Sequence, residues 1–180
     1  MIAVLNVHER ALPAAPETVG ALLDGLGSPD DRLWPPNWPP IRFEGPLAVG
    51  THGRHGVVRY TVSHHVPGRW VRFRFTGPRG FAGFHEFAVE RVDDRWTMLT
   101  HTLVVRPRAP LWPLWALFFR PLHDAVFRGV LDRAERELTG TVARPARWNP
   151  YVGLLRAATA RLAPRLAEEA RPVSRTNAKV

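Results

Sequence analysis

The chain has 180 residues, a mass of 20.3 kDa, 45% hydrophobic residues and 23% charged residues. These values exclude a fully disordered chain and a pair of large domains, and they predict one domain with a well-buried core. Cysteine is absent, which excludes a disulfide framework, a thiolate metal site and a cysteine nucleophile. The net charge of +9 would favour an anionic partner but says nothing about the fold.

The N-terminal residues lack a cationic run, and their apolar stretch is interrupted by Asn6, so we expect no signal peptide. The most hydrophobic segment, Leu111–Phe119, is much shorter than the about 20 apolar residues that cross a bilayer. We therefore expect a soluble protein that works in the cytoplasm.

Residues 2–12 alternate as a strand does, with Leu5, Val7 and Glu9 on one face, which we expect to point inward. A short helix is predicted to begin at Pro16, since proline and an acidic residue favour the first turn, and to end at Gly25. Residues 34–40 contain four prolines and two tryptophans, which predicts a stiff loop.

From residue 41 to residue 106 the hydrophobic pattern has a period of two, and turn signals lie close together. The sequence Val66-Pro67-Gly68-Arg69 predicts a two-residue hairpin loop. Its register would place Tyr60 opposite Phe75, Val62 opposite Phe73 and His64 opposite Val71, with all the apolar members on one face. The other face would be polar, as on the exposed side of an antiparallel sheet; it carries Arg59, Arg72, Arg74, Glu86, Glu90 and Thr100.

A long helical pattern covers residues 111–139 and stops at Gly140, with Asp132 and Glu135 mainly on its far side. Residues 144–150 read as a linker, and a second, weaker amphipathic pattern follows. We expect a domain at residues 1–140, and at residues 141–180 a linker, an amphipathic helix and a tail whose last ten residues are disordered.

This order of elements, together with several short motifs, resembles a known family. The motifs are Pro16-x-x-Val19, Leu23-Asp24, Trp34, Pro67-Gly68, Phe73-x-Phe75, Asp132-x-x-Glu135 and Leu138-x-Gly140. They resemble the helix-grip superfamily (SRPBCC) of START lipid-transfer domains, polyketide cyclases/dehydrases and pollen-allergen-like proteins. The resemblance covers residues 1–140 and departs at Gly20, where many members carry Trp or Phe. It implies an α+β fold in which a curved antiparallel sheet of six to seven strands wraps around a long C-terminal helix and leaves an apolar cavity.

If the inner face of the sheet lines such a cavity, its polar side chains are the informative ones. Under the expected pairing, His85 lies opposite Leu103 and His101 opposite Phe87, so the two histidines are diagonal neighbours about 7–8 Å apart at Cα. Further residues expected in or at the cavity are Tyr60, His64, Phe73, Phe119, His123, Glu9 and Trp34.

Two functions remain open. The residues fit a carrier or binding protein for a hydrophobic, polyketide-like or lipid-like molecule. They also fit a cofactor-free cyclase or dehydratase (a lyase), with His85 and His101 as acid and base and Tyr60 polarising an oxygen. Trp34 and Trp38 would form a lid over the cavity or simply pack beneath the sheet.

We expect no cofactor and no metal, because no HxH or HExxH spacing is present and His64 and His65 point to opposite faces of a strand. Nucleic-acid binding is not expected, since the basic residues are interleaved with acidic ones. Residues 145–170 would contact a membrane surface, a second subunit or the chain's own domain.

Overall fold

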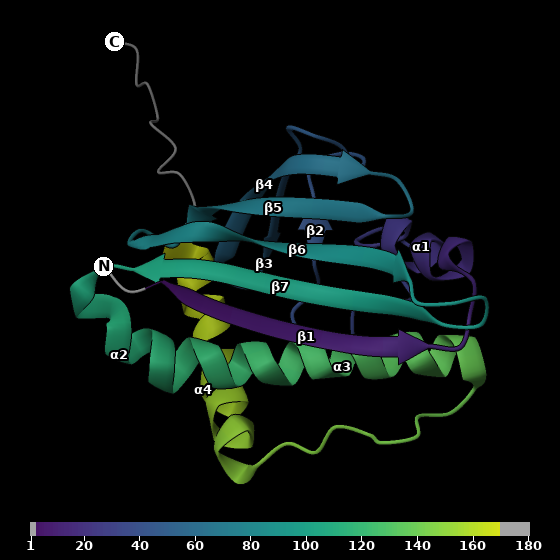
Figure 1. Cartoon of the computed structure of the whole chain (residues 1–180). Helices are drawn as coiled ribbons and strands as arrows, with labels where there is room; N and C mark the ends of the chain where they lie inside the picture. The colour runs from purple at the N-terminus through teal and green to yellow at the C-terminus, as the bar shows by residue number, and fades with distance from the viewer. Residues whose placement is uncertain (1–2, 170–180) are drawn as a thin grey trace. The chain divides into compact units, whose positions relative to one another are not determined.

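The computed structural model describes residues 3–169 and separates into two compact units, residues 1–147 and 148–180. Figure 1 shows the chain. In chain order its elements are β1 (Val4–Leu12), α1 (Pro16–Asp24), β2 (Arg42–Phe43), β3 (His52–His55), β4 (Val58–Val66), β5 (Trp70–Gly77), β6 (Phe81–Arg91), β7 (Thr97–Pro107), η1 (Ala109–Leu111), α2 (Trp112–Leu114), η2 (Trp115–Phe119), α3 (Arg120–Thr139) and α4 (Pro150–Glu169).

The seven strands form one antiparallel sheet in the order β1-β7-β6-β5-β4-β3-β2. Helix α3 lies along the sheet beside β1 (Figure 1), and the main core fills the space between the sheet, α1 and α3. This arrangement confirms the predicted α+β helix-grip fold. The core is rich in large apolar side chains, among them Val19, Leu23, Trp34, Tyr60, Phe73, Phe87, Leu99, Phe127 and Val130.

Helix α1 begins with Pro16 and is followed by Gly25, as predicted. Its Gly20 explains how this helix packs without the aromatic residue found in many helix-grip proteins. A Cβ at this position would lie 2.3 Å from the carbonyl oxygen of Gly68, so only glycine lets the helix touch the backbone of the β4–β5 hairpin. Asp24 strengthens this contact, because its Oδ1 accepts a hydrogen bond of 2.7 Å from the Gly68 amide.

The β4–β5 hairpin confirms two of the three predicted pairs, Tyr60–Phe75 and Val62–Phe73. The third is wrong. The register shifts between Val62 and His64, so His64 lies opposite Arg72. This one-residue shift turns His64 outward, where it is exposed and its ring lies against Trp70. His64 therefore does not face the interior.

Strand β1 also differs from the prediction: its polar face points inward. Leu5 is 68% exposed, Val7 is 48% exposed and Glu9 is exposed, so Glu9 does not line the interior. The inward side chains are Asn6, His8 and Arg10, because the part of α3 beside this strand presents carboxylates.

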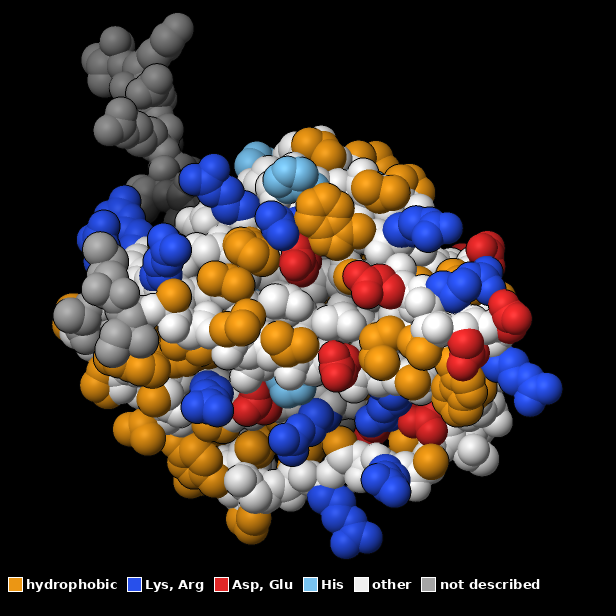
Figure 2. Space-filling model, in the orientation of Figure 1, with side chains coloured by type: hydrophobic (Ala, Val, Ile, Leu, Met, Phe, Trp, Pro, Cys, Tyr) orange, Lys and Arg blue, Asp and Glu red, His pale blue; other side chains and the backbone are white. Residues whose placement is uncertain are grey.

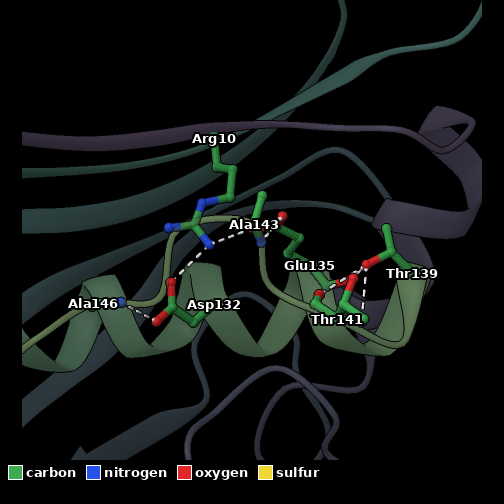
Figure 3. A network of polar contacts seen from close by, with 7 residues as sticks. All are labelled: Arg10, Asp132, Glu135, Thr139, Thr141, Ala143 and Ala146. Carbon is green, nitrogen blue, oxygen red and sulfur yellow. Dashed lines mark hydrogen bonds and ion pairs between the residues drawn. The ribbon is translucent and has the colours of Figure 1, made fainter.

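Arg10 is the clearest example of this polar contact. Its Nη1 lies 2.8 Å from Asp132 Oδ1 and 2.8 Å from Glu135 Oε2 (Figure 3). The same two carboxylates accept hydrogen bonds from the amides of Ala146 and Ala143, which ties residues 141–147 to the first unit. The sequence pattern placed Asp132 and Glu135 mainly on the far side of the helix. That prediction is wrong, since both carboxylates contact Arg10 of β1.

The long helical region ends as predicted, since Gly140 follows α3 in the left-handed conformation with a φ of 76°. Its beginning is irregular, because η1, the single turn α2 and the π-helical turn η2 precede α3. In the second unit, α4 includes the expected amphipathic segment. The guanidinium of Arg156, on α4, lies 4.1 Å from the ring centroid of Trp148, which precedes the helix. The predicted disordered tail, residues 171–180, lies outside the described residues.

The outward side of the sheet carries charges of both signs, as predicted. Arg72 Nε lies 2.6 Å from Glu86 Oε2, which also accepts a hydrogen bond of 3.0 Å from Trp70 Nε1. Figure 2 shows basic and acidic side chains interspersed among apolar ones on one face. No helix among the described residues is long and apolar enough to cross a membrane.

Candidate functional site

Five histidines from five different elements form a continuous file through the first unit. They are His55 on β3, His85 on β6, His101 on β7, His123 on α3 and His8 on β1. Successive ring centroids are 6.0, 5.5, 5.2 and 5.7 Å apart. Such a file of neighbouring imidazoles is the most distinctive chemical feature of the interior.

His85 and His101 form the centre of the file. The predicted register is confirmed, since His85 pairs with Leu103 and His101 with Phe87. Nδ1 of His85 lies 3.3 Å from Nε2 of His101, so one ring donates a hydrogen bond and the other accepts it. Burial, followed by the charges of neighbouring histidines, lowers the pKa of both imidazoles well below the ordinary value, which favours the neutral forms.

Aromatic rings fill the space around this pair. The Phe127 ring on α3 stacks on His101 with a centroid distance of 3.4 Å, and the Phe73 ring stacks on His85 at 4.8 Å. Both histidines are almost fully buried, at 2% and 0% exposure. At this point the sheet and α3 are therefore in contact through side chains, where the resemblance to the helix-grip superfamily implied an enclosed apolar cavity.

The remaining predicted residues lie at different places in the first unit. Trp34 is buried, and its Nε1 donates a hydrogen bond of 2.9 Å to the Pro39 carbonyl, which favours the packing interpretation over a lid. Phe87 is a core residue between the sheet and α3. Leu103 and Phe119 belong to a second apolar cluster around Trp115.

Tyr60 lies at the other side of His85, with ring centroids 5.1 Å apart. Its hydroxyl is 3.5 Å from Nδ1 of His55, a histidine that the sequence analysis did not single out. Burial raises the pKa of Tyr60 above its ordinary value, so the hydroxyl keeps its proton. Gly53 allows this packing, because a Cβ there would lie 2.5 Å from the Tyr60 ring and 2.7 Å from the Phe43 ring.

Next to Tyr60 the structure has a pocket of about 510 Å³. Three arginines on adjacent strands line it, and each pairs directly with the next, Arg42 with Arg54 and Arg54 with Arg59. Among residues 3–169 no ion pair neutralises any of the three. The other lining residues are Phe43, Glu44, His52, Gly53, Tyr60 and Thr76.

The far end of the histidine file meets a carboxylate that the sequence analysis also missed. Asp124 Oδ1 accepts a hydrogen bond of 2.8 Å from Asn6 Nδ2 and lies 3.1 Å from His8 Nε2. Burial alone would raise the pKa of Asp124, but the polar contacts of His123, His8 and Asn6 outweigh it and hold that pKa well below its usual range. The carboxylate is therefore ionised.

Comparison with known proteins gives likeness in structure only. No family model matches this sequence, and no curated protein matches it. The structure of norcoclaurine synthase from Thalictrum flavum in complex with dopamine and hydroxybenzaldehyde superposes with a TM-score of 0.62 at 9% identity, covering 79% of this chain and 90% of that one. A START superfamily protein from Mycobacterium smegmatis matches with a TM-score of 0.55 at 11% identity, over 76% of this chain and 97% of that one.

A third structure, CalU16 from Micromonospora echinospora, matches with a TM-score of 0.56 at 12% identity, over 91% of this chain and 88% of that one. At such identities the likeness is one of fold. The chain has the helix-grip fold that its sequence resembles.

Proposed function

We propose that the protein is a binding or carrier protein for a hydrophobic small molecule, polyketide-like or lipid-like, that carries an acidic group. The observation that supports this is the pocket beside Tyr60. Its lining residues include Phe43 and Tyr60 beside the three arginines, so an apolar body and an anionic group would both find partners there.

The arginine row supports an acidic ligand on physical grounds. Like charges directly opposite one another on neighbouring strands destabilise a sheet, and Arg54 faces such a charge on both sides. A carboxylate or phosphate bound between the guanidiniums would relieve this repulsion and form charge-assisted hydrogen bonds. The synthase structure that holds dopamine and hydroxybenzaldehyde supports the general idea that this fold accommodates aromatic small molecules.

Two fluorescent probes test the proposal. The apolar anion 8-anilinonaphthalene-1-sulfonate should bind the full chain, and Arg54→Gln should weaken that binding about tenfold, the effect of losing roughly 1.4 kcal/mol from one charge-assisted contact. The uncharged probe N-phenyl-1-naphthylamine should bind both forms alike. Arg74→Gln is the matched control, since Arg74 is exposed and does not line the pocket.

Equal affinity of the anionic probe for the parent protein and for Arg54→Gln would contradict a site at the arginine row. Native mass spectrometry of the freshly purified protein gives a second readout. We expect a co-purified apolar acid, and its release in the Arg54→Gln variant.

A second candidate function is a cofactor-free cyclase or dehydratase. The observation that favours it is the contact of 3.3 Å between His85 and His101, together with the Tyr60 ring, whose centroid lies 5.1 Å from that of His85. One imidazole would accept a proton from carbon while its neighbour or the tyrosine hydroxyl polarises the carbonyl oxygen. A substrate could reach this pair only after Phe127 moves away from His101.

The enzyme function is tested by separating affinity from turnover. His85→Phe and His101→Phe are each supplied with a poly-β-ketone thioester, and mass spectrometry follows the loss of water. Loss of turnover at unchanged affinity for the thioester would support catalysis. Unchanged turnover in both variants would eliminate these residues as acid and base.

A membrane or subunit contact through residues 145–170 stays a prediction, as does a location in the cytoplasm. If the contact is with a membrane, a chain that ends at residue 144 should no longer bind vesicles containing anionic lipid. If it is with a second copy, the same truncation should convert a dimer into a monomer, as measured by sedimentation.

A further inference from the structure

One cluster at the end of the histidine file is unrelated to the pocket beside Tyr60. His8 comes from β1, and His123 and Asp124 come from the beginning of α3. One ring nitrogen of each histidine and one carboxylate oxygen all lie within 4.8 Å of one another. The side chains of His8, His123 and Asp124 are 11%, 13% and 27% exposed, so the cluster lies near the surface and Asp124 is its most accessible member.

We infer that His8, His123 and Asp124 form a binding site for a divalent transition-metal ion. In a tetrahedral site with metal–ligand bonds of about 2.0–2.2 Å, neighbouring ligand atoms are about 3.3–3.5 Å apart. Here Asp124 Oδ1 lies 3.1 Å from His8 Nε2 and 3.8 Å from His123 Nδ1. Small side-chain rotations would bring the three atoms to the distances that an ion requires.

His123 gives further support, because its Nδ1 reaches Asp124 Oδ1 only at 3.8 Å, beyond hydrogen-bond distance. Neither of its ring nitrogens has a hydrogen-bond partner among residues 3–169, although both are buried. A buried polar atom without a partner costs free energy, so a structure that retains one is expected to use it. A metal ion would bind one of these nitrogens.

Asp124 is also held as metal-binding carboxylates usually are. Asn6 Nδ2 donates a hydrogen bond of 2.8 Å to its Oδ1, which fixes the orientation of the carboxylate. Arg120 Nε lies 4.0 Å from the other oxygen, Oδ2, and the arginine side chain is 59% exposed. The arginine can therefore turn to solvent and leave the carboxylate to the ion.

The ligand set defines the class of ion. Two imidazole nitrogens and one carboxylate oxygen suit Zn²⁺ and neighbouring first-row ions such as Co²⁺ and Ni²⁺, whereas Mg²⁺ and Ca²⁺ prefer oxygen ligands only. Because the ligands belong to β1 and α3, bound metal would join the edge strand to the long helix. Metal binding should therefore stabilise the folded chain.

The site is tested with the full chain produced without a histidine tag and freed of metal with EDTA. Titration with Co²⁺ should give one equivalent of tight binding with the visible absorption of a low-symmetry site, and Zn²⁺ should displace the cobalt and raise the melting temperature. Asp124→Asn and His8→Gln should each weaken binding about 100-fold or more. Asn6→Ala, which keeps all three ligands, should weaken it about 10–100-fold.

His64→Gln is the matched control, because His64 is exposed on the outward side of β4 and should leave binding unchanged. Circular dichroism of the metal-free variants checks that they fold. If a ligand variant does not fold, Asn6→Ala still tests the site, because it keeps all three ligands. Failure of the parent chain to bind one Co²⁺, or equal binding by Asp124→Asn, His8→Gln and the parent, would overturn the assignment. Equal weakening by the control would place the ion elsewhere and would also overturn it.

Discussion

Replacing His55 with phenylalanine should make the protein less sensitive to acid. His55 lies between Trp34 and Tyr60, with ring centroids 5.1 and 5.6 Å away, and faces His85 at 6.0 Å. Burial, assisted by the charge of His123, lowers the pKa of His55 from 6.5 to about 3. The folded protein therefore keeps this imidazole neutral at a pH where the unfolded chain would protonate it.

The size of the effect follows from proton linkage. Since the folded pKa lies below the unfolded one, His55 contributes its full stability above pH 6.5, and that contribution is lost progressively as the pH falls toward 3. Between pH 7 and pH 5 the loss amounts to about 2 kcal/mol. His85 should add to it in the same direction, because burial also lowers its pKa.

Urea unfolding at pH 7 and pH 5, in the presence of EDTA, measures the effect. The difference in the free energy of unfolding between the two pH values should be about 2 kcal/mol smaller in His55→Phe than in the parent. Comparing differences removes the direct effect of the substitution on packing. Identical pH dependence in His55→Phe and the parent would refute the claim that His55 is kept neutral by burial.

Three further changes test the packing. Gly20→Ala should lower the free energy of unfolding by about 1–3 kcal/mol, because its methyl group would collide with the Gly68 backbone; a neutral result would mean that α1 does not lie on the hairpin. Gly53→Ala should destabilise the protein by a similar amount, and it should weaken 8-anilinonaphthalene-1-sulfonate binding because the methyl group would displace Tyr60 and Phe43. Gly25→Ala is the control for both glycine variants, since its methyl group would meet nothing closer than 3.5 Å. Arg10→Ala should cost about 2 kcal/mol in urea unfolding because it leaves Asp132 and Glu135 together without their cation, whereas Arg91→Ala, which loses only an exposed pair, should cost less than about 0.5 kcal/mol; equal costs would contradict the role of the Arg10 network.

The order of elements and the register of the central strands could be predicted because they depend on local signals. Turn residues define the hairpins, and strict alternation of apolar residues fixes which strand positions share a face. For this reason the contact between His85 and His101 was foreseeable without coordinates. The bulge before His64 was not, since no residue in that segment marks where one strand gains a residue over its partner.

The polar side of β1 shows what a single-element pattern misses. Leu5 and Val7 resemble the inner face of a strand when β1 is considered alone. The deciding information lies in α3. Residues 6–10 of a strand span about 13 Å and residues 124–132 of a helix about 12 Å, so Asn6, His8 and Arg10 match the carboxylates of Asp124 and Asp132 in both charge and spacing. The cluster of His8, His123 and Asp124 is formed by this long-range match, so no motif within one element predicts it.

The pocket beside Tyr60 was missed for a related reason. Its arginines belong to β2, β3 and β4, two of which are very short, and the sequence analysis treated Arg59 only as part of an exposed face. Pairing across three strands brings the guanidiniums into one row, and that pairing depends on how the chain between residues 41 and 58 turns.

Ser63 is the extra residue of β4 that sets the pairing of the two histidines after it. It is the residue left without a partner where β4 gains one position over β5. Without Ser63 the ladder would be regular and would still place His64 opposite Arg72 and His65 opposite Val71, so His65 would keep its approach to Asp24. Deletion of Ser63 therefore leaves the pairing of both histidines unchanged, whereas pairing of Ser63 with Arg72 would place His64 opposite Val71. Alignments of distant relatives should treat Ser63 as a gap position before any histidine in this strand is assigned a shared role.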